Sequence, residues 1–183
     1  MKVISTPIDG VKIIEPLYYG DDRGYFAPIF EDRKFKELGI PDQFTRLNSS
    51  FSTTKGTIRG LHYQPPPDQE AKMVYVVRGK IWDVALDIRK NSPTYGQWTG
   101  IELDAQTKRW FYVPAGCAHG FQTLEENCEI IYLCSSYYNI KTEWGIRWND
   151  PSFNVEWPLQ PTILSEKDKE RPNFDPKIHL WWN

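Results

Sequence analysis

The fold is decided by two adjoining runs, KMVYVV at residues 72–77 and KIWDVALDI at residues 80–88, which Arg78-Gly79 separates. Both runs are rich in Val, Ile, Tyr and Trp, and the dipeptide between them is a plausible turn. Four further runs of this kind follow: Trp98 to Leu103, Arg109 to Val113, Gly120 to Leu124 and Glu129 to Ser135. Strands this short, with no long helical period between them, predict an all-β antiparallel sandwich or jelly roll and not βαβ units.

Helical patterns are few and short. Glu31 to Leu38 has a helical pattern, and Gly39 is placed as its stop. Near the C-terminal end, Ser165 is placed to cap a short helix, with Asp168 three residues on where a capping box usually has glutamate. The 183 residues contain no internal repeat and no low-complexity linker, so we expect one domain over residues 1–183.

Composition limits the classes of function. The net charge of −2 indicates neither a nucleic-acid-binding nor a membrane-binding surface. The first residues, MKVISTP, contain no long apolar run, so neither a signal peptide nor a membrane span is expected. Cys117, Cys128 and Cys134 lack CxxC spacing and indicate free thiols in a reducing compartment. We therefore expect a soluble cytoplasmic protein.

A segment with chemical potential, GTIRGLHYQ at residues 56–64, precedes the first run. Together with Lys72, its Arg59 and His62 suit an anionic carbon acid, because a guanidinium binds phosphate, an imidazole takes a proton and an ammonium holds an oxyanion. Simple alternation sends Arg59 and His62 to opposite faces of a strand. For both to meet one ligand, Gly60 must form a bulge or bend.

Three other side chains leave alternatives open. Lys72 shares a strand face with Val74, so either that face opens onto a polar cavity or Lys72 lies just before the buried part of the strand. His119 either holds a turn through backbone hydrogen bonds or contacts a ligand. Tyr132, in the apolar run IIYLC, is either a core tyrosine with a satisfied hydroxyl or an acid.

A protein-bound catalytic metal is not expected. A metal-binding cupin-type jelly roll needs a His-x-His pair and further His and Glu ligands, whereas His62, His119 and His179 are far apart and no cysteine pair replaces them. The sequence therefore favours metal-free chemistry or plain binding.

Seven fragments stand in an order and spacing that together are highly specific: DRGYF at 22–26, GTIRGLHYQ at 56–64, VALDIR at 84–89, SPTYGQW at 92–98, AHGF at 118–121, RWNDP at 147–151 and LSEKD at 164–168. On these fragments, nearly the whole chain resembles the dTDP-4-dehydrorhamnose 3,5-epimerase family. The resemblance implies a metal-free cupin-type jelly roll (a double-stranded β-helix) with N-terminal strands, a C-terminal extension and a few short helices. It also implies a homodimer without a cofactor that serves deoxysugar synthesis, such as that of dTDP-rhamnose.

The resemblance also implies the catalytic roles. His62 would be the general base and Asp168 the group that orients it. Tyr132 would be the acid on the opposite face of the sugar, and Lys72 would steady the C4 oxygen as it becomes an enolate.

Substrate-binding residues follow from the same resemblance. Arg23 and Arg59 would hold the diphosphate, with Asn48, His119, Glu143 and Lys167 nearby. Tyr138 would stack on the nucleotide base, with Phe26 near that end.

Three residues depart from the family pattern. Pro28 stands where glutamate is usual, Arg46 where glutamine is usual, and Cys117 where phenylalanine is usual. Arg46 adds a positive charge and is a candidate substrate contact, which favours a substrate with an additional acceptor. Alternatively, it pairs with Glu31 or Asp42, and Pro28 merely ends an edge strand.

The leading prediction is a cofactor-independent isomerase that inverts C3 and C5 of a nucleotide-linked 4-keto-6-deoxyhexose, turning dTDP-4-keto-6-deoxy-D-glucose into dTDP-4-keto-L-rhamnose. A 3- or 5-monoepimerase of another deoxysugar is the enzymatic alternative. A non-catalytic sugar-nucleotide-binding jelly roll is the alternative of another class, although binding alone needs no base, acid and oxyanion cation together.

Overall fold

The structure is a computed structural model that describes residues 1–40 and 43–179. Its elements, in chain order, are β1 (Lys2–Ser5), β2 (Lys12–Glu15), β3 (Tyr19–Asp21), β4 (Gly24–Phe26), α1 (Asp32–Glu37), β5 (Arg46–Ser52), β6 (Ile58–Tyr63), β7 (Lys72–Arg78), β8 (Lys80–Asp87), β9 (Trp98–Asp104), β10 (Trp110–Val113), β11 (Cys117–Thr123), β12 (Cys128–Cys134), β13 (Trp144–Gly145), α2 (Glu166–Lys169) and α3 (Pro176–His179).

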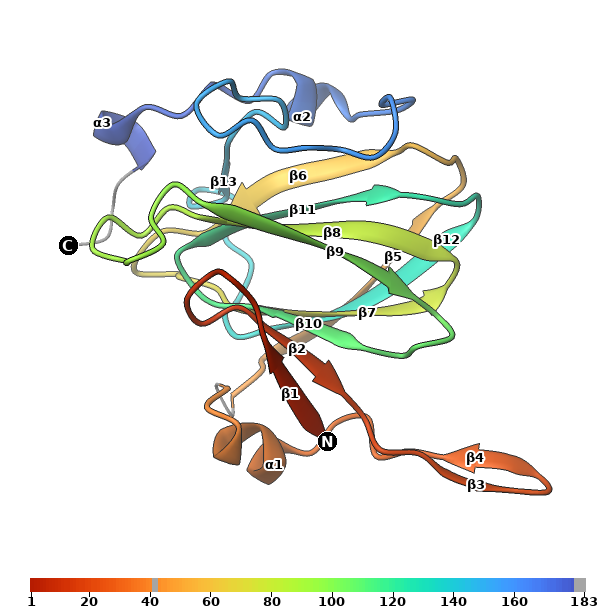
Figure 1. Cartoon of the computed structure of the whole chain (residues 1–183). Helices are drawn as coiled ribbons and strands as arrows, with labels where there is room; N and C mark the ends of the chain where they lie inside the picture. The colour runs from red at the N-terminus through yellow and green to blue at the C-terminus, as the bar shows by residue number, and fades with distance from the viewer. Residues whose placement is uncertain (41–42, 180–183) are drawn as a thin grey trace.

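Two antiparallel sheets face each other, as Figure 1 shows. One has six strands in the order β1-β2-β10-β7-β12-β5, and the other has five in the order β13-β6-β11-β8-β9. Inward-facing side chains such as Val74, Val76, Ile81, Ala85 and Phe111 form the core between them. This arrangement is the predicted jelly roll, and it follows from strands whose alternate residues are apolar.

The central strands lie within one residue of the predicted bounds, apart from one start. β11 begins at Cys117 and not at Gly120, because its backbone pairs with β8 from Cys117 opposite Asp87 onward. His119 therefore lies inside a strand, not in the turn before it. The early helix is also confirmed, with Gly39 just beyond it at a φ of +68°.

Both ends of the chain add to the sandwich. At the N-terminal end, β3 and β4 form a hairpin that extends away from the sheets (Figure 1). At the C-terminal end, the segment after β13 returns past β6, where Thr57 and Ile163 form a bridge, and α2 contacts β6. This return places residue 168 beside the five-stranded sheet. No helix in residues 1–40 and 43–179 is long and apolar enough to cross a membrane.

Candidate active site

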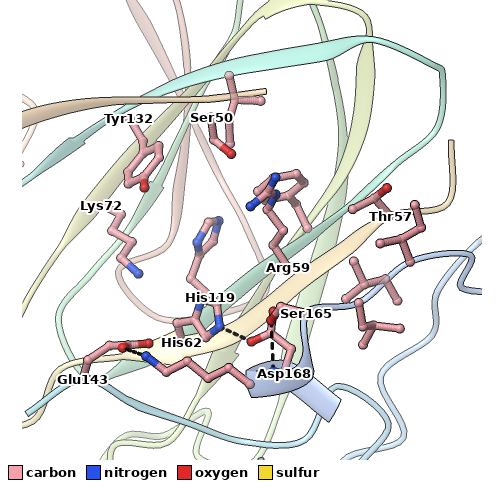
Figure 2. A pocket seen from close by; sticks show the side chains of 16 residues that line it. Ser50, Thr57, Arg59, His62, Lys72, His119, Tyr132, Glu143, Ser165 and Asp168 are labelled. Atoms are coloured by element: carbon pink, nitrogen blue, oxygen red, sulfur yellow. Dashed lines mark hydrogen bonds and ion pairs between the residues drawn. The ribbon is translucent and has the colours of Figure 1, made fainter. Parts of the chain in front are cut away.

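A cavity of about 390 Å³ lies between the two sheets, and a second of about 280 Å³ adjoins it. Side chains shared by both linings are His62, Lys72, Tyr132, Glu143 and Lys167. The walls come from β6 and β11 of one sheet, β5, β7 and β12 of the other, and residues 163–168 (Figure 2). The cavity thus collects charged residues from segments that are distant in sequence.

Gly60 resolves the difficulty of bringing Arg59 and His62 to one cavity. The β6–β11 register shifts between the pairs His119–His62 and Phe121–Arg59, so β6 is irregular at this glycine. Gly60 has a φ of +131°, and a Cβ there would lie 2.5 Å from Gly120 Cα. Only glycine fits such a backbone and such a close approach. The bend expected from the sequence is present, and Arg59 and His62 line the same cavity.

Helix α2 brings a carboxylate to the histidine. Ser165 is the N-cap, and its Oγ accepts a hydrogen bond from the Asp168 N–H at 3.1 Å. Asp168 is only 3% exposed, and its Oδ1 is 2.5 Å from His62 Nε2 (Figure 2). The cap therefore fixes the backbone position from which Asp168 reaches His62.

The surroundings set the protonation of this pair. Burial lowers the pKa of His62, Asp168 works in the opposite direction, and the positive charges of Lys72 and Arg171 lower it further. Burial by itself raises the pKa of Asp168, but hydrogen bonds from His62 and Ser165 leave it below its ordinary value. The pair is thus a neutral imidazole beside a carboxylate anion. Because the anion accepts from Nε2–H, the lone pair of the ring is on Nδ1.

Lys72 and Tyr132 face this pair from the other sheet. The Lys72 side chain is 12% exposed and lines the cavity, so of its two alternatives the polar cavity is correct. Burial, with the nearby Cys134 and Glu70, raises the pKa of Tyr132, so its phenol keeps the proton. Figure 2 shows Tyr132 on one side of the cavity, His62 on the other, and the Lys72 ammonium between them.

His119 forms a second histidine–carboxylate pair. Its Nε2 is 2.6 Å from Oδ1 of the fully buried Asp83, and the ring lines the cavity. A turn-holding role through backbone hydrogen bonds is therefore wrong, because the residue lies within β11 and its ring bonds a carboxylate. Asp83 was not predicted, although a signal existed: it shares the inward-facing set of β8 positions with Ile81 and Ala85.

Arg46 is paired with a carboxylate that the sequence did not predict. Its Nη2 contacts Oε1 of Glu70, a residue only 7% exposed that sequence reasoning missed. The alternative pairing with Glu31 is thus wrong, because Glu70 comes within reach just before β7, and Asp42 lies outside the described residues. The guanidinium also lies 5.8 Å from the ring centroid of Tyr138. Arg46, Glu70 and Tyr138 all line the smaller cavity.

Glu143 lines both cavities and contacts three donors. It contacts Lys167 Nζ through Oε2, Arg171 Nη2 through Oε1 at 2.6 Å, and the Tyr138 hydroxyl at 3.2 Å. Burial by itself raises the pKa of Glu143, but the hydrogen bond from Lys167 and the positive charge of Arg171 bring it below its ordinary value. Arg171 is a further residue that sequence reasoning missed.

Three predicted substrate-binding residues do not line either cavity. The Arg23 side chain is 89% exposed and Phe26 is 69% exposed, since both belong to the hairpin that extends away from the sheets (Figure 1). Within one chain, therefore, the structure does not bring them to the site. Asn48 lies opposite Tyr132 in the β5–β12 ladder and donates from Nδ2 to Cys134 Sγ at 3.5 Å, which places it beside the lining.

The other two departures lie apart from the cavities. Cys117 is buried in the core, where burial raises its pKa to about 12. Pro28 is partly buried and follows β4, which ends two residues earlier at Phe26. Among residues 1–40 and 43–179, no three His, Cys, Asp or Glu side chains are grouped as a metal ion would require.

Known proteins resemble this chain in both sequence and fold. The sequence profile described as dTDP-4-dehydrorhamnose 3,5-epimerase matches residues 5–176. The chain belongs to this epimerase family. It is therefore an enzyme of the isomerase class.

Individual members of the epimerase family match over nearly their full lengths. The dTDP-4-dehydrorhamnose 3,5-epimerase of Shigella flexneri is 46% identical over 175 residues, which are 95% of this chain and 96% of that protein. A crystal structure of the epimerase from Elizabethkingia anophelis has a TM-score of 0.93 at 41% identity and covers 98% of each chain. The Legionella pneumophila dTDP-6-deoxy-D-glucose-3,5-epimerase, in complex with dTDP-4-keto-L-rhamnose, has a TM-score of 0.91 at 41% identity, covering 100% of this chain and 98% of that one.

Proposed function

We propose that this chain is a cofactor-independent epimerase that inverts C3 and C5 of dTDP-4-keto-6-deoxy-D-glucose and yields dTDP-4-keto-L-rhamnose. One observation carries the proposal: a histidine held by a buried carboxylate and a protonated tyrosine face one cavity from two different sheets. A substrate held between them is exposed to a base on one face and to an acid on the other. The similar Legionella enzyme holds dTDP-4-keto-L-rhamnose.

Proton removal is the first step. The C4 ketone acidifies the hydrogens at C3 and C5, and His62 Nδ1 takes one of them as H⁺. The electron pair of the broken C–H bond forms a carbon–carbon double bond, and the carbonyl electrons move to O4. Lys72 stabilises this oxyanion, because its ammonium lines the cavity on a side chain that is only 12% exposed.

Reprotonation from the opposite face inverts the centre. Tyr132 gives its proton to the carbon, O4 regains its double bond, and the configuration is reversed. A raised pKa suits this step, because the phenol stays protonated until the strongly basic enolate carbon is present. The phenolate and the imidazolium then return to their starting states by exchange with solvent, so no redox cofactor takes part.

The nucleotide end of the substrate is assigned to the remaining polar lining. Arg59 and His119 would bind the diphosphate, with Asn48 and the Glu143–Lys167 pair nearby. Arg59 is held by Ser52 Oγ at 3.1 Å and the Phe51 carbonyl at 3.0 Å, so its guanidinium is fixed before substrate arrives. Tyr138 would stack on the base at the smaller cavity.

A homodimer accounts for the two predicted residues that lie on the exposed hairpin. Arg23 and Phe26 lie on an exposed hairpin whose other aromatics, Tyr19 and Tyr25, are 60% and 55% exposed. Such an apolar surface is typical of an interface, and we infer that a second copy covers it and receives Arg23 and Phe26 near its own cavity. We also assign the enzyme to the cytoplasm, because Cys117, Cys128 and Cys134 are free thiols.

Deuterium labelling tests the reaction. The protein is incubated with dTDP-4-keto-6-deoxy-D-glucose in deuterium oxide, and NMR locates the label and the configuration of the product. Label and inversion at both C3 and C5 support the proposal, whereas label and inversion at a single carbon indicate a monoepimerase. No label at either carbon, with dTDP still bound, would leave a sugar-nucleotide-binding protein.

A further inference from the structure

A single buried carboxylate lies between two cations of the cavity wall. Arg46 of β5 and Lys72 of β7 are both register partners of Cys134 in β12, so the three residues form one row across three strands. Neighbouring strands are about 4.8 Å apart, which separates the two cation-bearing backbones by roughly 10 Å. The Glu70 side chain, 5% exposed, bridges this gap with Oε1 to Arg46 and Oε2 to Lys72.

The two contacts of Glu70 are unequal. Arg46 makes the direct one, whereas Lys72 Nζ is 3.5 Å from Oε2, longer than a charge-assisted hydrogen bond. Arg46 also donates from Nε to the Ser136 carbonyl at 2.9 Å and lies over the Tyr138 ring. Its guanidinium is therefore anchored on several sides. The ammonium of Lys72 is close to the carboxylate but keeps its donors for the cavity.

We propose that Glu70 and Arg46 are positioning residues that keep Lys72 available to the oxyanion. Arg46 binds the Glu70 carboxylate directly, so Glu70 orients the Lys72 side chain without forming a close ion pair with it. The positive charge of Arg46 is in turn neutralised by Glu70. This inference rests on the proposed function. It replaces the expectation that Arg46 is an additional free donor to the substrate, because its positive charge is already matched by Glu70.

Removing one partner should harm the site more than removing both. In Arg46→Gln, Glu70 loses its first partner and closes on Lys72, which withdraws the ammonium from O4. We expect kcat to fall about tenfold, the size typical of coupled neighbours in a charge network. In Arg46→Gln/Glu70→Gln, two neutral amides face each other and Lys72 is released, so kcat should return to within about threefold of wild type.

The experiment measures kcat and KM for the wild type, Arg46→Gln, Glu70→Gln and the double variant, with unfolding midpoints for each. Arg109→Gln is the matched control, because Arg109, just before β10, forms an ion pair of 2.6 Å with Glu15 of β2, and neither residue lines a cavity. If the pair were merely structural, the fold-loss of kcat in the double variant would equal the product of the fold-losses in the two single variants.

The outcomes separate this inference from the proposed function. Recovery of kcat in the double variant supports the positioning role. An active wild type whose Arg46→Gln variant keeps its kcat, or whose double variant fails to recover, overturns the inference alone. A wild type that exchanges neither C3 nor C5 hydrogen overturns the proposed function and this inference with it.

Discussion

Replacement of Asp168 by asparagine should reduce kcat/KM by about 10³–10⁴-fold while leaving the fold in place. A positioned general base contributes about 10²–10⁴-fold, and loss of the carboxylate that fixes a catalytic histidine tautomer can cost most of that. The structure indicates the upper part of this range. His62 Nε2 and Asp168 Oδ1 are 2.5 Å apart, and Asp168 is 3% exposed, so water has little access to replace the carboxylate.

The pH dependence of kcat/KM tests the same substitution in a second way, through the direction in which the profile shifts. His62 must be neutral to accept a proton, so activity is lost as the pH falls through its pKa. Burial lowers that pKa, and Asp168 is the group that opposes the lowering. A neutral asparagine removes the opposition. The acid limb of kcat/KM should therefore move to lower pH even as the plateau falls.

The assay follows product formation by NMR over a pH series, with dTDP affinity measured as a check on the rest of the site. Glu166→Gln is the control on the same helix, because its side chain is 81% exposed and pairs with the solvent-exposed Lys169. Its rate should match that of the wild type. An Asp168→Asn protein with more than a tenth of wild-type kcat/KM, or an acid limb at higher pH, would refute the assigned pairing.

Three further outcomes follow from the same geometry. Lys72→Ala should lower kcat more than dTDP affinity, because the oxyanion that Lys72 stabilises exists fully only in the transition state, whereas Arg59→Ala should weaken dTDP binding and make it less salt-sensitive. Kinetics and calorimetry at two salt concentrations test this, and the same pattern in both variants would contradict it. Tyr132→Phe should still wash solvent deuterium into the substrate but lose inverted product about 100-fold, as NMR can measure, and normal inversion would exclude it as the donor. Gly60→Ala should cost about 2–5 kcal/mol of unfolding free energy through backbone strain and overpacking against β11. Gly96→Ala, at a φ of +78° with open space around it, should cost about 1 kcal/mol, and equal losses in urea unfolding would contradict the close approach.

The sheet-forming segments were predictable because their burial is local. Both faces of β7 and β8 are buried, so their apolar and aromatic composition reveals the strands, and alternation places Lys72 on the same face as Val74. Strand order was beyond this kind of reasoning. Nothing local in β12 states that its neighbours are β7 and β5, since those pairings join segments separated by long stretches of chain.

The site was predictable only in part for the same reason. His62 and Asp168 are separated by 106 residues, and their pairing was expected from the family resemblance, not from any local pattern. Asp83 left a trace, as a charge in an apolar run. Glu70 left none, because it follows a Pro-rich loop in which a carboxylate is unremarkable and becomes buried only when Arg46 arrives from β5.

His62 and Tyr132 belong to separate sheets, so on the proposed roles the configuration of the product depends on the distance between the two sheets. Side chains such as Val76 and Phe111 act as the spacers that hold one sheet at its distance from the other. On the proposed roles, a small widening of this gap leaves the base in contact with the sugar but takes the acid out of reach. The carbanion then recaptures hydrogen on the side from which it left. Inversion would consequently be lost before hydrogen exchange is lost. The ratio of exchanged to inverted sugar would then report how tightly the core between the sheets is packed.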